Sequence, residues 1–276
     1  MKTDSTTKPN HISLDLSRVD EPPIDLKGLA TRETASFDTL IGPMLNPPRK
    51  SDMRNTRVLM NRLADNPHYT PPSADCPDAP YGVYLDRRIA GFDTRVTDSV
   101  YMGHSPREAL VIDPRPEGEI MRLYRKFRWL RLRFMAEYLW QHRARMNRGI
   151  MQREQLFLLM RFVQDEMPFD KHRAERLVAE YNAKNDVKLT LDVFIRARAG
   201  VCRHQVCLYA VLVELLQEHG HMGGKVSLQR GKFYRMSHAW VRFTSEWGQI
   251  YIIDPAQDRF GNIAEMGEHE RDFYSI

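Results

Sequence analysis

The stretch GVCRHQVCLYAVLVELL, from Gly200 to Leu216, decides the fold of this chain. The residues that follow Cys202 are mainly apolar. A helix that is apolar around most of its circumference must be buried. Burial fixes the first turn of such a helix in space, and the positive end of the helix dipole favours a thiolate there. The stretch therefore predicts a buried helix that carries a reactive cysteine, Cys202, at its N-terminus.

Two polar residues downstream lie at the ends of predicted strands. His238 is in SHAWVRF and Asp254 is in YIIDP, so each side chain can be directed into a cleft. A thiol nucleophile needs a base that takes its proton and a group that orients this base. We therefore predict that Cys202 is the nucleophile, that His238 holds its proton and that Asp254 binds the far ring nitrogen. This layout indicates an enzyme.

The three motifs together resemble the transglutaminase-like superfamily of papain-type thiol enzymes. Their spacings are 238 − 202 = 36 and 254 − 238 = 16 residues, in the order cysteine, histidine, aspartate. FVQDEMPFD and LTLDVFIRARAG are similar to that family's lead-in to the cysteine, so the resemblance runs from Phe162 to the C-terminus. It implies an α+β fold with a papain/transglutaminase-like core, in which the cysteine-bearing helix packs on a small antiparallel sheet.

The expected reaction is thiol-dependent acyl transfer on protein amide groups through a thioester. Water as the acceptor gives a cysteine protease or a glutamine deamidase, and an amine gives transamidation; the triad does not separate these outcomes. We rank hydrolysis above crosslinking, because calcium-dependent members of the family carry acidic sites and the sequence shows no acidic calcium loop. The alternative is a catalytically silent binding module of the same fold, which docks an anionic partner through an arginine-rich helix.

An acyl-transfer site also needs donors for the oxyanion. The backbone N–H of Cys202, at the start of its helix, is the natural first donor. Gln164 and His204 are both candidates for the second, and the sequence does not decide between them. His204 and Trp240 are further expected to flank the cleft and to contact substrate.

No metal or cofactor is predicted. Cys202, His204, Cys207 and His238 form a poor zinc set, because Cys-x4-Cys within a helix does not match the usual ligand spacing. Five residues separate the two cysteines, which turns Cys207 ~140° away from Cys202 on a helix. We therefore expect Cys207 in the core.

The composition supports a packed core and a mildly basic surface. Lys and Arg number 41 against 36 Asp and Glu, so the net charge is +5; this permits an anionic partner but selects none. The three cysteines are scattered, which predicts free thiols and a reducing, cytoplasmic compartment. No signal peptide or transmembrane segment is expected.

Three regions are predicted along the chain. Residues 1–57 are polar and rich in proline, which is typical of a disordered leader; a translocation signal, as in bacterial effectors, is the alternative. Residues 58–160 are expected to form a helical N-terminal region, and residues 161–276 the catalytic core.

The sequence of the N-terminal region predicts a long helix, Glu117–Asn147, and one face of this helix is strongly basic. This face is either a docking surface for nucleic acid or lipid, or a solvated face paired with acidic residues elsewhere. Its candidate docking residues are Arg122, Arg125, Arg128 and Arg133.

The remaining elements follow from periodicity and turn residues. Short strands are expected within Arg88–Ile112. The expected helices are Val58–Leu63, Arg153–Glu166, Lys171–Asn182 and Thr190–Arg196, the last with Thr190 as its N-cap. The expected strands of the core are Lys225–Gln229, Ser237–Phe243 and Gln249–Ile253, with Gly248 in the turn between the last two.

Overall fold

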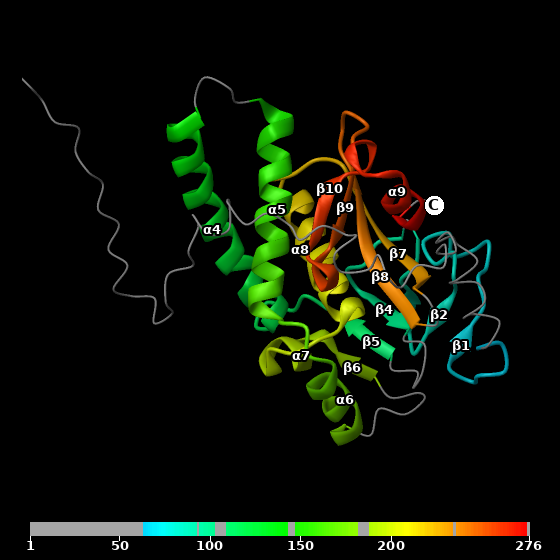
Figure 1. Cartoon of the computed structure of the whole chain (residues 1–276). Helices are drawn as coiled ribbons and strands as arrows, with labels where there is room; N and C mark the ends of the chain where they lie inside the picture. Colours follow the sequence, from blue (N-terminus) through cyan, green and yellow to red (C-terminus); the bar gives the residue numbers. More distant parts are fainter. Residues whose placement is uncertain are drawn as a thin grey trace, which may run out of the picture. The chain divides into compact units, whose positions relative to one another are not determined.

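The computed structural model describes residues 63–92, 94–102, 109–142, 147–181, 188–233 and 236–274. Over these residues the protein has an α+β fold with six α-helices and two β-sheets (Figure 1). They all belong to one compact unit, Glu33–Ile276. The predicted leader, residues 1–57, and the predicted helix Val58–Leu63, apart from its last residue, lie outside the described residues.

The helix α8, Cys202–Glu218, lies at the centre of the fold (Figure 1). Every residue from His204 to Leu216 is buried. The helix packs against α4, α5 and α7 and against the strands β7 and β8. The prediction of a buried helix with Cys202 at its first residue is therefore confirmed.

A four-stranded antiparallel sheet covers one side of α8, in the order β10-β9-β8-β7. The strands predicted for the core all exist, although β7 continues four residues beyond the predicted end at Gln229. Gly248 has a φ of +76° in the turn between β8 and β9, as this turn requires. The strands are β7 Lys225–Phe233, β8 Met236–Thr244, β9 Ile250–Asp254 and β10 Arg259–Asn262.

The N-terminal region is not only helical, and it contains the short strands that were expected within Arg88–Ile112. It supplies five strands of a second, six-stranded mixed sheet in the order β1 to β6. Two strand pairs are parallel, β3 with β4 and β5 with β6, and the second pair joins residues that are distant in the sequence. The strands are β1 Tyr69–Thr70, β2 Val83–Tyr84, β3 Arg87–Ile89, β4 Ser99–Met102, β5 Ala109–Ile112 and β6 Lys188–Thr190.

The predicted helices that the structure describes agree with the observed ones except at their ends, and the helix at Glu268–Tyr274 was not predicted. α5 begins at Arg148 rather than Arg153, because the Asn147 side chain caps it by accepting from the Ile150 N–H at 2.8 Å. Thr190 is the N-cap residue of α7, but its side chain makes no capping bond. The helices besides α8 are α4 Glu119–His142, α5 Arg148–Glu166, α6 Lys171–Glu180, α7 Leu191–Ala197 and α9 Glu268–Tyr274.

A small aromatic cluster connects α9 with the four-stranded sheet. Trp240 of β8 is completely buried and contacts Phe273 and Tyr274 of α9, with ring centroids 5.5 and 5.4 Å apart. Ile252 of β9 and Met266 complete the cluster. The last helix of the chain is thereby held against the sheet that carries His238.

Within the described ranges, no helix combines the length and the apolar character that crossing a membrane requires.

A buried carboxylate of α8 anchors the loop before β4. Glu214 accepts hydrogen bonds from the backbone N–H groups of Val96 and Thr97, both at 2.7 Å, and from the Thr97 hydroxyl at 2.5 Å. Its neighbour on the same helix, Glu218, makes a solvent-exposed ion pair with Arg95.

We expect Glu214→Ala to lower the free energy of unfolding by about 2–4 kcal/mol, because each buried donor left unsatisfied costs about 1–3 kcal/mol. The matched control, Glu218→Ala, removes only an exposed ion pair and is expected to cost less than about 1 kcal/mol. Urea denaturation measures both values. Equal losses for the two variants would contradict the anchoring role of Glu214.

Candidate active site

The backbone that leads into α8 is held on both sides of Gly200. The N–H of Gly200 donates to the Pro168 carbonyl at 3.2 Å, and the Asp170 N–H donates to the Gly200 carbonyl at 2.9 Å. A Cβ on Gly200 would lie 2.6 Å from the Met167 sulfur, so a larger residue at this position would force the backbone at Gly200 away from Met167. The position of Cys202, two residues later, is fixed by these contacts and by the burial of α8.

The half-buried thiol of Cys202 has partners that favour its thiolate. Burial raises its pKa. His238 lowers this pKa through a hydrogen bond and its charge, and the charge of Arg203 and the backbone N–H of Ala239 lower it further. The net effect lowers the pKa of Cys202 below the ordinary thiol value. These partners shift Cys202 toward its anionic form.

His238 connects the thiol with a buried carboxylate. Its Nε2 lies 2.6 Å from Asp254 Oδ2, which leaves Nδ1 for the hydrogen bond to Cys202. Burial alone lowers the pKa of His238, but the charge and hydrogen bond of Asp254, together with Cys202, raise the pKa to about 10. An imidazolium at neutral pH therefore faces the Cys202 sulfur and favours its thiolate form.

Asp254 is completely buried at the end of β9 and uses both oxygens. Oδ1 accepts from the Gln257 N–H at 3.2 Å, and Oδ2 accepts from the Tyr274 hydroxyl at 3.0 Å as well as from His238. Burial is the main cause that raises the pKa of Tyr274 far above its usual value, so this hydroxyl stays a donor. Sequence reasoning missed Tyr274, because an aromatic pair near the C-terminus carries no signal of its own.

The structure brings together the three residues proposed as a triad, but it does not place the three auxiliary residues as predicted. His204 is fully buried, stacks on Phe194 and accepts the Val201 N–H at Nδ1, so it caps α8 rather than facing a cleft. Trp240 is also fully buried in the aromatic cluster and cannot contact a substrate.

Gln164 forms hydrogen bonds with the turn that follows Asp254. Its Nε2 donates to the Pro255 carbonyl at 2.8 Å and to Asp258 Oδ1 at 3.0 Å, which uses both of its N–H groups. The amide is therefore committed to the turn rather than to an oxyanion. The Cys202 N–H, at the first position of α8, belongs to the helix groups that lack an acceptor within the helix and is the remaining predicted donor.

A second residue that sequence reasoning missed is Phe169. Its backbone forms an isolated parallel bridge with Gly200, and its side chain is 53% exposed. An exposed aromatic residue thus has its backbone bonded beside Gly200, two residues before Cys202.

The arginines of the predicted basic helix lie on α4. Two of them form exposed ion pairs with acidic residues of the same helix, Arg122 with Glu119 at 2.7 Å and Arg133 with Glu137 at 3.1 Å. Arg125 donates to the Pro116 carbonyl, and Arg128 lies over the Tyr124 ring. Pairing within the helix thus accounts for part of the basic face.

No group of three or more His, Cys, Asp and Glu side chains in the described part of the chain could hold a metal ion.

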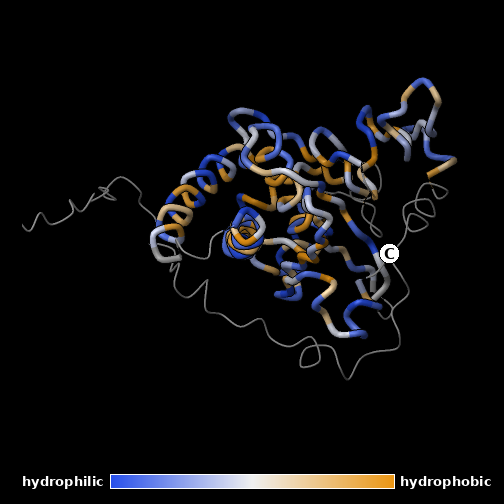
Figure 2. The backbone as a smooth tube through the Cα atoms, turned by 90° about the horizontal axis from the view of Figure 1, so that it is seen from above, coloured by the Kyte–Doolittle hydropathy of each residue, from blue (hydrophilic) through white to orange (hydrophobic). Residues whose placement is uncertain are grey.

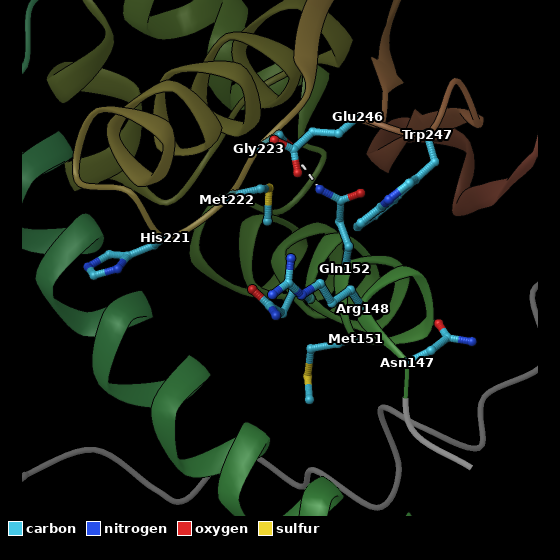
Figure 3. Close-up of a pocket in the computed structure, with 10 residues that line it drawn as sticks. Asn147, Arg148, Met151, Gln152, His221, Met222, Gly223, Glu246 and Trp247 are labelled. Atoms are coloured by element: carbon cyan, nitrogen blue, oxygen red, sulfur yellow. Dashed lines mark hydrogen bonds between the residues drawn. The ribbon is translucent and has the colours of Figure 1, made fainter.

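A cavity of about 410 Å³ lies away from the triad, at the other end of α8. His221, Met222 and Gly223, which follow α8, line it together with the first turns of α5, and α8 spans about 25 Å between this cavity and Cys202. In Figure 3 the His221 ring points away from the other lining side chains. The lining mixes Arg148 with Glu246, so its charge selects no class of ligand.

Comparison of the chain with family models, curated proteins and solved structures gives no match. The geometry of Cys202, His238 and Asp254 therefore carries the functional argument.

The lowered pKa of Cys202 predicts its alkylation rate. In a Cys76→Ser background, which removes the exposed thiol, iodoacetamide should label Cys202 at lower pH than it labels an ordinary thiol, because the lowered pKa increases the thiolate fraction there. His238→Ala removes the main stabilising group and should slow labelling at pH 6 by at least about tenfold. Mass spectrometry of the labelled peptides distinguishes Cys202 from the buried Cys207. Labelling that begins only near the ordinary thiol pKa would contradict the ion pair.

Proposed function

We propose that this chain is a thiol-dependent acyl-transfer enzyme that acts on protein amide groups, as a cysteine protease or a glutamine deamidase. The observation that carries the proposal is the linked set of Cys202, His238 and Asp254, in which the pKa of the thiol is lowered and that of the imidazole is raised. Perturbed pKa values of this kind are typical of activated nucleophiles. The core around α8 and its antiparallel sheet is consistent with the transglutaminase-like resemblance, which we retain as part of the proposal.

In the first step the Cys202 thiolate attacks the amide carbonyl carbon and forms a C–S bond. The Cys202 backbone N–H, at the positive end of α8, stabilises the negative charge that develops on the carbonyl oxygen. His238 gives its Nδ1 proton to the leaving nitrogen as the C–N bond breaks, which yields a thioester and an amine, or ammonia in a deamidation.

In the second step water attacks the thioester, and His238 takes its proton. The C–S bond breaks, so the carboxylic acid leaves and the thiolate–imidazolium pair is restored. Asp254 keeps its charge throughout, orients Nε2–H and stabilises the imidazolium. A protein amine that replaced water would give transamidation, which we rank below hydrolysis.

Two consequences for partners and location remain proposals. The substrate is a protein that presents an amide next to Phe169 and the start of α8. The cytoplasm is the proposed compartment because the nucleophile must stay reduced, and delivery as a translocated effector is the alternative.

Four variants test the roles within the site. Cys202→Ala should abolish the reaction, because no other group forms the thioester, and His238→Ala should be nearly as severe. Asp254→Asn should cost less, by roughly one to two orders of magnitude, and should move the alkaline limit of activity to lower pH, because the charge that raises the pKa of His238 is lost. Cys207→Ser, the matched control, should keep the chemistry and lose only stability, about 1–3 kcal/mol.

The measurement is mass spectrometry of cellular proteins incubated with each variant. Cleavage, deamidation and crosslinking leave different mass changes and so identify the reaction. An active Cys202→Ala protein would contradict the assignment of the nucleophile. A wild-type protein whose Cys202 is alkylated rapidly but which modifies no substrate would favour the silent binding module.

A further inference from the structure

The outward side of α4 exposes large hydrophobic side chains to solvent. Seven such side chains are exposed in the described part of the chain, and α4 carries four of them: Trp129 at 45%, Leu132 at 60%, Leu139 at 42% and Trp140 at 84%. Together with the exposed Ala136 they recur every three or four residues, so they share one side of the helix. We call Trp129, Leu132, Ala136, Leu139 and Trp140 the apolar stripe.

The apolar stripe is not part of the core. The buried positions of α4, Leu123, Phe127, Leu130 and Phe134, lie on the opposite side of the helix, against the rest of the protein. In Figure 2 α4 lies at the edge of the described part, where orange and blue residues alternate along its tube. Contiguous exposed apolar surface of this kind marks an interaction site.

The same outward side is basic in the first half of the helix. Arg122 and Arg125 precede Trp129 by seven and four residues, which places them in line with the apolar stripe. α4 contains six Lys and Arg residues but only two acidic ones, Glu119 and Glu137. The exposed ion pairs that these form with Arg122 and Arg133 are worth little and are easily exchanged. The outward face of α4 therefore joins a cationic half to a Trp- and Leu-rich half.

We propose that this face docks on an anionic phospholipid surface. Tryptophan and leucine would enter the boundary between head groups and acyl chains, and Arg122 and Arg125 would contact the negative head groups. The inference goes beyond the proposed reaction and does not depend on it.

The distribution of charge disfavours other occupants. Nucleic acid would use the arginines but would gain nothing from Leu132 and Leu139. A second copy of the chain, related by a two-fold axis, would set arginines against arginines if the helices were parallel, or against the apolar stripe if they were antiparallel. An anionic surface with an apolar interior satisfies both halves of the face at once.

Vesicle co-sedimentation of the full chain tests this proposal. The protein should bind vesicles of phosphatidylcholine mixed with phosphatidylserine and should not bind pure phosphatidylcholine, and added salt should weaken binding. The double variant Leu139→Ser/Trp140→Ser should lower the partition coefficient by about tenfold or more, because neither position then buries a large apolar side chain in the membrane interface. Arg122→Glu/Arg125→Glu should weaken it by a similar factor through repulsion.

Tyr181→Ser is the matched control, because Tyr181 is 53% exposed but lies outside α4; it should bind like wild type. Thermal unfolding should be unchanged in all variants, since the substituted side chains are exposed. The proposal is overturned if wild type does not bind the anionic vesicles at low salt, or if the Leu139/Trp140 variant binds them normally. Dimerisation or nucleic-acid binding that requires the stripe, without vesicle binding, would also overturn it.

Discussion

The burial of α8 is the constraint on which the rest of the structure depends. The helix is apolar around most of its circumference, so it is stable only when other elements cover it, and the antiparallel sheet and the helices α4, α5 and α7 provide this cover. A helix held on every side cannot shift, which fixes its first residue, Cys202. The same packing sets the strand that carries His238 across from the thiol. Core stability and the geometry of the candidate site thus have one physical origin.

A buried imidazolium is the second requirement of the site, because burial by itself opposes a charge on His238. Asp254 supplies the opposite charge, and it is in turn held by the Gln257 N–H and the Tyr274 hydroxyl. Tyr274 belongs to α9, which packs against Trp240 of β8. Gln164 holds the turn after Asp254 from α5. The helix α9 and the turn after Asp254 therefore help to hold the carboxylate that stabilises the imidazolium, although both are remote from Cys202 in sequence.

The errors of the sequence interpretation have one cause. Gln164, His204 and Trp240 were placed near the cleft because of their position next to the motifs, but each is used for structure: a turn, a helix cap and a hydrophobic cluster. A polar or aromatic residue beside a reactive one has the same sequence pattern in either role. The strands of the mixed sheet were indistinct for a similar reason, since segments of two to four residues are too short to show an alternating pattern.

The sequence by itself determined the elements whose signal is local. These are the buried helix with Cys202 at its start, the strand that begins near His238, the strand that ends near Asp254, and the amphipathic helix with its arginines. Each follows from periodicity, turn residues and charge along a short stretch. Only the tertiary structure decided which strands pair in the mixed sheet, that Tyr274 binds Asp254, and that Trp129, Leu132, Leu139 and Trp140 stay exposed. These features depend on contacts between residues far apart in the chain, and burial or exposure is settled by what the other elements cover.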